Sequence, residues 1–149
     1  MSDDLRELYQ ELIFDHYKRP RNRGPLPKAS HHAEGHNPLC GDRMTVYLEV
    51  DDGMVRNVSF QGEGCAIATA SASLMTEALK GLTLEEARGL FKGFHDLVTL
   101  GAAEGSPELG KLAVFTGVRE YPMRVKCATL AWHALMAALD AQDLPVTTE

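Results

Sequence analysis

Three cysteines and one aspartate are the residues of this 149-residue chain with the most distinctive chemistry. A single glycine separates Cys40 from Asp42, whereas Cys65 and Cys127 lie far along the chain. Three thiolates and a carboxylate can complete a tetrahedral zinc site or hold most of an iron–sulfur cluster. The residue types therefore predict a metal site, provided that tertiary structure brings the four side chains together.

Spacing alone does not establish a shared site, because the chain has no Cys-x-x-Cys pair and scattered cysteines can be unrelated. The sequence around each cysteine nevertheless favours a shared site. Gly41 lets the loop turn Cys40 and Asp42 toward one ion without a Cβ clash. Cys65 is expected at the N-terminus of a helix of small residues, where free amides and the helix dipole favour a thiolate. Cys127 is expected in the first turn of a later helix.

Such a ligand set would leave a net negative charge around a divalent ion, which calls for cations nearby. Arg43, Arg124 and Lys126 are the adjacent candidates. Arg124 and Cys127 are three residues apart in the expected helix and so share a face, which would let the guanidinium reach the sulfurs. The alternative is that Arg124 and Lys126 only make the start of the helix soluble.

The histidines have plainer interpretations. His31, His32 and His36 precede the first cysteine and could reach a metal, but a polar, proline-rich loop often carries solvated histidines. We expect His16 to pack or hydrogen-bond at the end of a helix. We expect His133 to face solvent or a partner.

Hydrophobic periodicity predicts the elements that must position these residues. A capping box, Thr83-Leu84-Glu85-Glu86, opens one helix, and proline in a first turn marks another start near Pro107. The basic run 18–23 is interpreted as a solvated loop or a protein-docking surface. We expect a helix over 3–18, an irregular connection over 19–41, a hairpin of strands 44–50 and 54–60, and helices over 65–75, 83–93 and 123–139.

Composition sets further limits. With 44% hydrophobic and 24% charged residues, the chain fits one globular domain over 1–149. The net charge of −6 argues against nucleic-acid binding, and no segment approaches the roughly 20 apolar residues of a membrane span. The charged N-terminus lacks an export signal, so we expect a cytoplasmic protein whose cysteines stay reduced.

Four motifs together resemble U-type iron–sulfur cluster assembly proteins, the NifU N-terminal-like group that includes SufU and IscU. The resemblance spans residues 5 to 140. It is stronger to the SufU branch, because Lys126 stands where IscU has histidine and the Leu-Pro-Pro-Val-Lys motif of IscU is absent. The motifs are Asp15-His16-Tyr17-x-x-Pro20-Arg21-Asn22, Cys40-Gly41-Asp42, Gly62-x-Gly64-Cys65-Ala66 and Arg124-x-Lys126-Cys127-Ala128-x-Leu130.

This resemblance implies an α+β fold, with a small antiparallel sheet packed against several helices in a single compact domain. It implies zinc held by Cys40, Asp42, Cys65 and Cys127, with Fe²⁺ or a [2Fe-2S] cluster as alternatives on the same ligands. It also implies a zinc-dependent sulfurtransferase-like carrier that takes persulfide sulfur from a SufS-like cysteine desulfurase. The sulfur would pass to a cluster scaffold or apo-protein acceptors. The alternative is that the chain is itself the scaffold.

Within the sulfur-carrier hypothesis, Cys40 is the expected sulfur acceptor, because its loop is flanked by glycine while helices anchor Cys65 and Cys127. Arg124 is expected to support it. Two other classes of zinc protein are alternatives. A zinc deaminase would need the pairing of His-x-Glu with Pro-Cys-x-x-Cys, which is missing. A purely structural zinc protein would use the same four ligands and fold around the ion.

Overall fold

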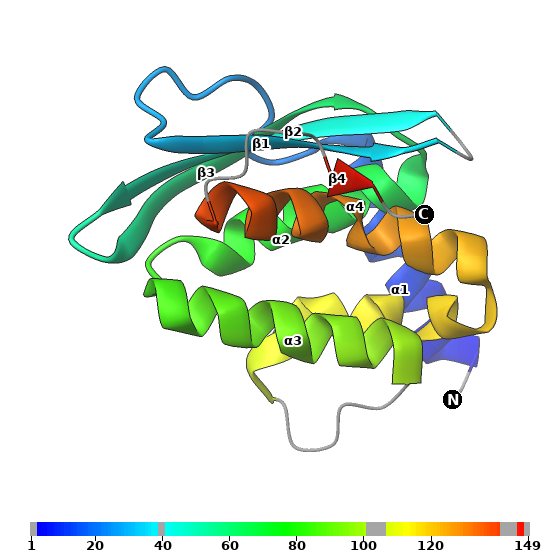
Figure 1. Ribbon diagram of the computed structural model, residues 1–149. Coiled ribbons are helices and arrows are strands. Elements are labelled where there is room, and N and C mark those ends of the chain that lie inside the picture. Colours follow the sequence, from blue (N-terminus) through cyan, green and yellow to red (C-terminus); the bar gives the residue numbers. More distant parts are fainter. Residues whose placement is uncertain (1–2, 39–40, 101–106, 141–145, 148–149) are drawn as a thin grey trace.

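The structure, a computed structural model, describes residues 3–38, 41–100, 107–140 and 146–147. The elements in chain order are α1 (Asp3–Lys18), β1 (His31–Asn37), β2 (Asp42–Asp51), β3 (Met54–Glu63), α2 (Ala66–Leu79), α3 (Leu84–Leu100), a 3-10 helix η1 (Pro107–Glu120), α4 (Pro122–Leu139) and β4 (Val146–Thr147). The sheet forms one layer and the helices lie on one side of it (Figure 1). This arrangement confirms the predicted α+β class.

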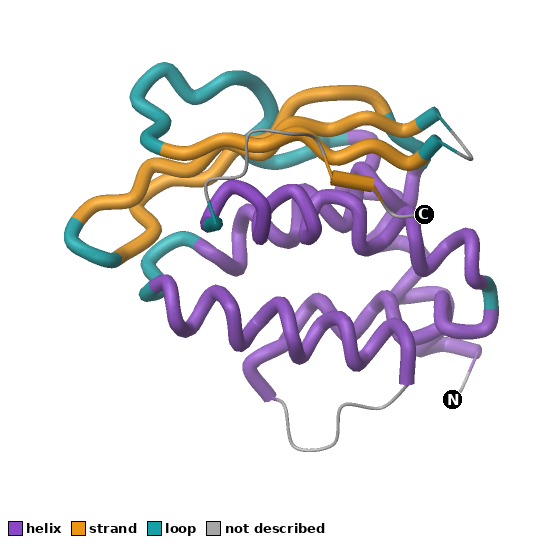
Figure 2. The backbone as a smooth tube through the Cα atoms, viewed as in Figure 1, coloured by secondary structure: helices purple, strands orange, loops and turns teal. Residues whose placement is uncertain are grey.

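The sheet has the strand order β3-β2-β1-β4, in which β1, β2 and β3 are antiparallel and β4 runs parallel to β1 (Figure 2). Alternate residues of β2, including Met44, Val46 and Leu48, are buried against the helices, as their pattern predicts. Asp52 and Gly53 both have positive φ in the turn between β2 and β3. The predicted hairpin is therefore confirmed, with turn residues suited to a tight connection.

Strand β1 corrects the prediction of an irregular connection over 19–41. Its buried positions are Ala33, Gly35 and Asn37, which give no hydrophobic alternation that a sequence pattern could detect. Gly35 lies against α4, and a Cβ there would come within 3.1 Å of the Leu130 carbonyl oxygen. The close packing of α4 therefore favours glycine over the larger apolar residues that usually mark a strand in a sequence.

Helices α2 and α4 lie directly under the sheet and form the centre of the core. The small residues of α2 allow close approach, and the buried Ser71 joins the two helices. Its hydroxyl donates to the Ala128 carbonyl oxygen at 2.6 Å and accepts from Trp132 Nε1 at 3.1 Å. Trp132 in turn stacks on Phe94 of α3, with ring centroids 4.6 Å apart. Helices α2 and α4 are thus fixed to each other, and α4 is fixed to α3.

Helix α3 begins at the predicted capping box but runs to Leu100, beyond the predicted end near Gly93. Thr83 N–H donates to Glu86 Oε1 at 2.9 Å, and Glu86 N–H donates to Thr83 Oγ1 at 3.1 Å. The glycine does not end the helix because Phe94 and Leu97 continue its buried stripe. Tertiary packing outweighs the weak helix propensity of one glycine.

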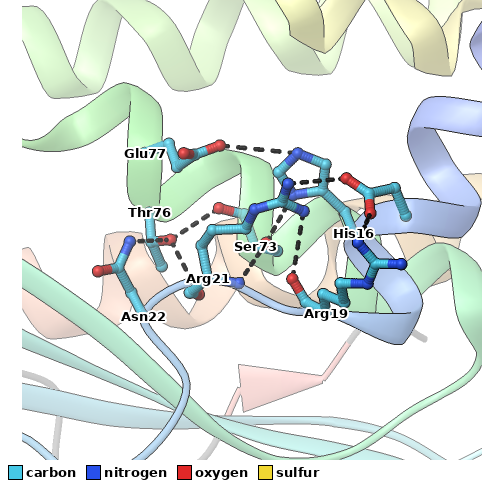
Figure 3. A network of polar contacts seen from close by, with 8 residues as sticks. His16, Arg19, Arg21, Asn22, Ser73, Thr76 and Glu77 are labelled. Atoms are coloured by element: carbon cyan, nitrogen blue, oxygen red, sulfur yellow. Dashed lines mark hydrogen bonds and ion pairs between the residues drawn. The ribbon is translucent and has the colours of Figure 1, made fainter.

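His16 is 1% exposed and joins the end of α1 to α2, in agreement with the packing role predicted for it. Its Nδ1 lies 2.7 Å from Ser73 Oγ, and its Nε2 lies 3.6 Å from Glu77 Oε1 (Figure 3). Burial lowers the pKa of His16, and the nearby Arg21 cation lowers it further. His16 therefore favours the neutral form and serves as a fixed hydrogen-bonding group.

His133 differs from its predicted place on the surface. It is partly buried and packs edge-on against Phe91 of α3, with ring centroids 5.6 Å apart. Burial lowers the pKa of His133, and His95 contributes in the same direction.

Among the described helices, none is both long and apolar enough to cross a membrane.

Candidate metal centre

Asp42, Cys65 and Cys127 come together at one end of the sheet, with one ligand atom of each within 4.8 Å of the others. Asp42 is the first residue of β2, Cys65 precedes α2, and Cys127 lies in α4. Asp42 lies near Cys65 because β2 begins beside the end of β3, where Arg43 pairs with Glu63. Cys40, the fourth predicted ligand and predicted sulfur acceptor, lies outside the described residues.

Cys65 is the N-cap residue of α2, as the sequence predicts. Its sulfur accepts a hydrogen bond from the Ala68 N–H at 3.4 Å, and its own N–H donates to Asp42 Oδ1 at 3.2 Å. The free amides of a helix start thus orient the sulfur and link it to the carboxylate. Cys65 is exposed, so a reagent or partner can reach it.

Gly64 lies close to the site residues, and a side chain there would have to displace the end of Met44, a constraint that sequence reasoning missed. A Cβ at Gly64 would lie 2.8 Å from Met44 Cε and 3.7 Å from Asp42 Cγ. The Gly-x-Gly pattern before Cys65 was the available signal. The reason for it is tertiary, since Met44 and Asp42 belong to another strand.

Cys127 is 5% exposed and lies in the second turn of α4, which corrects the prediction of the first turn. The helix begins at Pro122, whose fixed φ suits the first helical position. Cys127 is therefore held within the body of the helix rather than at its start.

The two cysteines interact directly. The Cys127 thiol hydrogen-bonds to the Cys65 sulfur and, with help from the Ala68 N–H, lowers the pKa of Cys65 to about 7. Burial and the negative charge of Asp42 oppose this shift but are outweighed. Cys65 therefore carries a substantial thiolate fraction at neutral pH, which is the state that binds metals.

We expect the alkylation rate of Cys65 in metal-free protein to be half-maximal near pH 7, because only the thiolate reacts. The measurement uses iodoacetamide and a Cys40→Ser background, in which buried Cys127 is the only other thiol. Cys127→Ala removes the hydrogen-bond donor and should move the midpoint upward, toward the ordinary thiol value of about 8.5. A midpoint already near that value in the parent protein would contradict the geometry.

The described donors fit a zinc ion. Ligands at about 2.3 Å for sulfur and about 2.0–2.2 Å for oxygen in a tetrahedron lie about 4 Å or less from one another, so the observed group needs only a small contraction. Two thiols and one carboxylate also suit ferrous iron. The metal-binding group found among the described residues contains no histidine. His31 contacts Ser30, and His32 stacks on Tyr47.

Two of the three predicted cations, Arg124 and Arg43, lie beside other groups. The exposed Arg124 guanidinium lies over the Tyr121 ring, 4.4 Å from its centroid. Arg43 Nε lies 3.4 Å from Glu34 Oε1 on the outer face of the sheet. The supporting role of Arg124 therefore stays a prediction.

Comparison with known proteins gives consistent matches over most of the chain. The model of the NifU-like N terminal domain matches residues 8–141. The zinc-dependent sulfurtransferase SufU of Bacillus subtilis (strain 168) is 43% identical over 132 residues, which cover 89% of each chain. An iron–sulfur cluster assembly scaffold protein IscU of Streptococcus pyogenes serotype M1 is 38% identical over 135 residues, covering 91% of this chain and 84% of the relative.

Solved structures agree with this match. A putative iron–sulfur cluster assembly scaffold protein for the SUF system, from Fervidobacterium islandicum AW-1, superposes with a TM-score of 0.82. The two chains are 36% identical, and the superposition covers 93% of this chain and 99% of the other.

Proposed function

The chain belongs to the NifU-like N terminal domain family of iron–sulfur cluster assembly proteins, and from this premise we propose that it is a zinc-dependent sulfur carrier. It would accept sulfane sulfur from a cysteine desulfurase and deliver it to a cluster scaffold or an apo-protein. The observation that supports this most is the convergence of Asp42, Cys65 and Cys127 at an accessible end of the fold.

In this proposal the zinc ligands are Asp42, Cys65 and Cys127, with Cys40 as the fourth. When bound, zinc would hold the cysteines as thiolates at neutral pH. The protein supplies the remaining features. The helix N-terminus orients Cys65, the core of α4 fixes Cys127, and the Cys65 N–H orients Asp42.

Cys40 is the proposed acceptor, which requires that its thiolate be free of the metal when it attacks. Its thiolate attacks the outer sulfur of the desulfurase persulfide, a new sulfur–sulfur bond forms on Cys40, and the desulfurase cysteine leaves as a thiolate. Atoms and electrons balance without an oxidant. The neighbouring Gly41 has a φ of +73°, which suits a loop that must turn sharply between β1 and β2. Arg124, three residues before Cys127, would supply a cation close to the transferred sulfur.

The test is the turnover of a cysteine desulfurase with and without this protein, measured as alanine formed from cysteine. A sulfur acceptor should increase turnover, because it removes the persulfide that otherwise blocks the next cycle. The rise should saturate with the concentration of this protein. No change in turnover would reject the carrier proposal and favour a site that only stabilises the fold.

A second function, the cluster scaffold, is favoured by the match to IscU of Streptococcus pyogenes over most of both chains. Thiolate-rich sites accept zinc, iron and clusters alike, so ligand types do not decide between the two. Metal analysis of protein purified without air separates them. Colourless protein with about one zinc per chain, as expected for four protein ligands, supports the carrier. Brown protein with iron and acid-labile sulfide supports the scaffold.

A further inference from the structure

Residues 19–24 follow α1 and run between α2 and the outer edge of β3; we call this segment the clamp. It contains the Pro20-Arg21-Asn22 part of the sequence motif that the proposed sulfur chemistry does not use. Its basic residues were predicted to be solvated or to bind a partner. Arg19 and Arg23 are exposed, in keeping with that prediction. Arg21 is partly buried and pairs with Asp15 at 2.7 Å, and Asn22 is held by hydrogen bonds on both sides, of which Figure 3 shows the one to Thr76.

On one side the clamp is bonded to β3. The Phe60 N–H donates to the Asn22 carbonyl oxygen at 3.1 Å, and the Gly24 N–H donates to the Phe60 carbonyl oxygen at 2.7 Å. Further along, Arg23 Nη2 donates to the Gly62 carbonyl oxygen at 3.2 Å. These contacts cover the last part of β3, immediately before the turn that carries Cys65.

On the other side the clamp is bonded to α2. The Arg21 N–H donates to the buried Ser73 Oγ at 2.9 Å, and Asn22 Nδ2 donates to Thr76 Oγ1 at 3.0 Å. Lys80 Nζ donates to Asn22 Oδ1 at 2.6 Å. Asn22 therefore contacts both elements, through its backbone on β3 and its side chain on α2.

The conformation of Asn22 makes these two sets of contacts possible. Its φ is +57°, in the left-handed region that asparagine tolerates better than other residues with a side chain. Glycine would accept the same φ but would lose the contacts to α2. Asparagine thus meets the backbone requirement and supplies the side-chain bonds together.

The clamp spans the joint where Cys65 lies. Strand β3 ends at Glu63 and helix α2 begins at Ala66, so the angle between them sets the position of Cys65. The other donors, Asp42 and Cys127, are carried by β2, which pairs with β3, and by α4, which packs on α2, so the clamp acts together with these contacts in fixing the angle between β3 and α2. A change in the β3–α2 angle would therefore move Cys65 relative to them.

We propose that Asn22 is a positioning residue that holds Cys65 at metal-binding distance from Asp42 and Cys127. The inference rests on the proposed metal centre but not on sulfur transfer. Metal ligands must be placed within about 0.2 Å of ideal distances, and loss of residues that orient ligands typically lowers metal affinity about 10- to 100-fold.

The test is Asn22→Gly, which keeps the positive φ and the backbone bonds to Phe60 while removing the bonds to Thr76 and Lys80. Zinc affinity, measured by competition with a chromophoric chelator, should fall about 10-fold or more. The ligand-field spectrum of the Co²⁺-loaded protein should change as well. The matched control is Asn57→Gly, which is exposed on β3 far from Cys65 and loses a hydrogen bond to Glu49. It should leave both readouts unchanged.

A second pair of variants approaches the same bond from α2. Thr76→Val keeps the shape but removes the hydroxyl that accepts from Asn22, so it should share the loss of zinc affinity. Thr76→Ser keeps the hydroxyl and should bind zinc about as tightly as the unsubstituted protein.

The inference is overturned if Asn22→Gly and Thr76→Val lower the unfolding free energy of metal-free protein but leave zinc affinity and the Co²⁺ spectrum unchanged. Failure of the unsubstituted protein to bind zinc or Co²⁺ would instead overturn the metal centre itself, and with it the role of the clamp.

Discussion

Replacing Cys40 with serine is expected to abolish persulfide capture by this protein. A serine hydroxyl stays protonated at neutral pH and cannot form the sulfur–sulfur bond that retains the transferred atom. The measurement is the intact mass of the protein after incubation with a cysteine desulfurase and cysteine. The parent chain should gain one sulfur atom, and Cys40→Ser should gain none.

The interpretation of this variant depends on showing that the rest of the centre survives. Cys65 and Cys127 are held by α2 and α4, so the substitution should leave the fold and the Cys65–Cys127 contact intact. Circular dichroism and the pH dependence of Cys65 alkylation check this. A Cys40→Ser protein that still gains sulfur at full stoichiometry would assign the acceptor role to another residue.

The elements that the sequence predicts best are those whose buried residues repeat with a regular period. The hairpin has alternating apolar residues and an Asp52-Gly53 turn, and α4 has a long apolar stripe that includes Leu130 and Leu135. Strand β1 escapes prediction because Gly35 and Asn37 occupy buried positions that are usually apolar. The constraint on Gly35 comes from α4, which is nearly a hundred residues away in the chain.

In the candidate site, too, local sequence predicts some features, whereas others depend on distant parts of the chain. Side-chain chemistry and the resemblance between motifs predict which residues belong to it, and helix-start signals predict the N-cap position of Cys65. The clamp could not be predicted, because most of its bonds join backbone groups or residues more than 50 positions apart, such as Asn22 and Thr76. A basic run with a proline has the composition of a solvated loop. Only the tertiary structure shows that this segment is bonded to β3 and α2.

Gly62→Ala is expected to be the most damaging single substitution in the sheet. Gly62 pairs with Met44 of β2, and a Cβ at this position would lie 2.2 Å from the Arg43 carbonyl oxygen. Its φ of +134° is also rarely adopted by residues with a side chain. Backbone strain of about 1–3 kcal/mol and overpacking of about 1–3 kcal/mol would together remove a large part of a typical stability of about 5–15 kcal/mol.

The matched control for this prediction is Gly53→Ala in the same hairpin. Gly53 also has a positive φ, +73°, but a Cβ there would meet no atom within 4 Å, so only the strain remains. Urea unfolding of both metal-free proteins should show the larger loss for Gly62→Ala. Because Arg23 bonds to the Gly62 carbonyl and Cys65 follows three residues later, this variant should also lose zinc affinity, whereas Gly53→Ala should retain it. Equal stability of the two variants would mean that β2 and β3 can separate at Gly62 without cost, and the position of Cys65 would then have to be fixed by α2 alone.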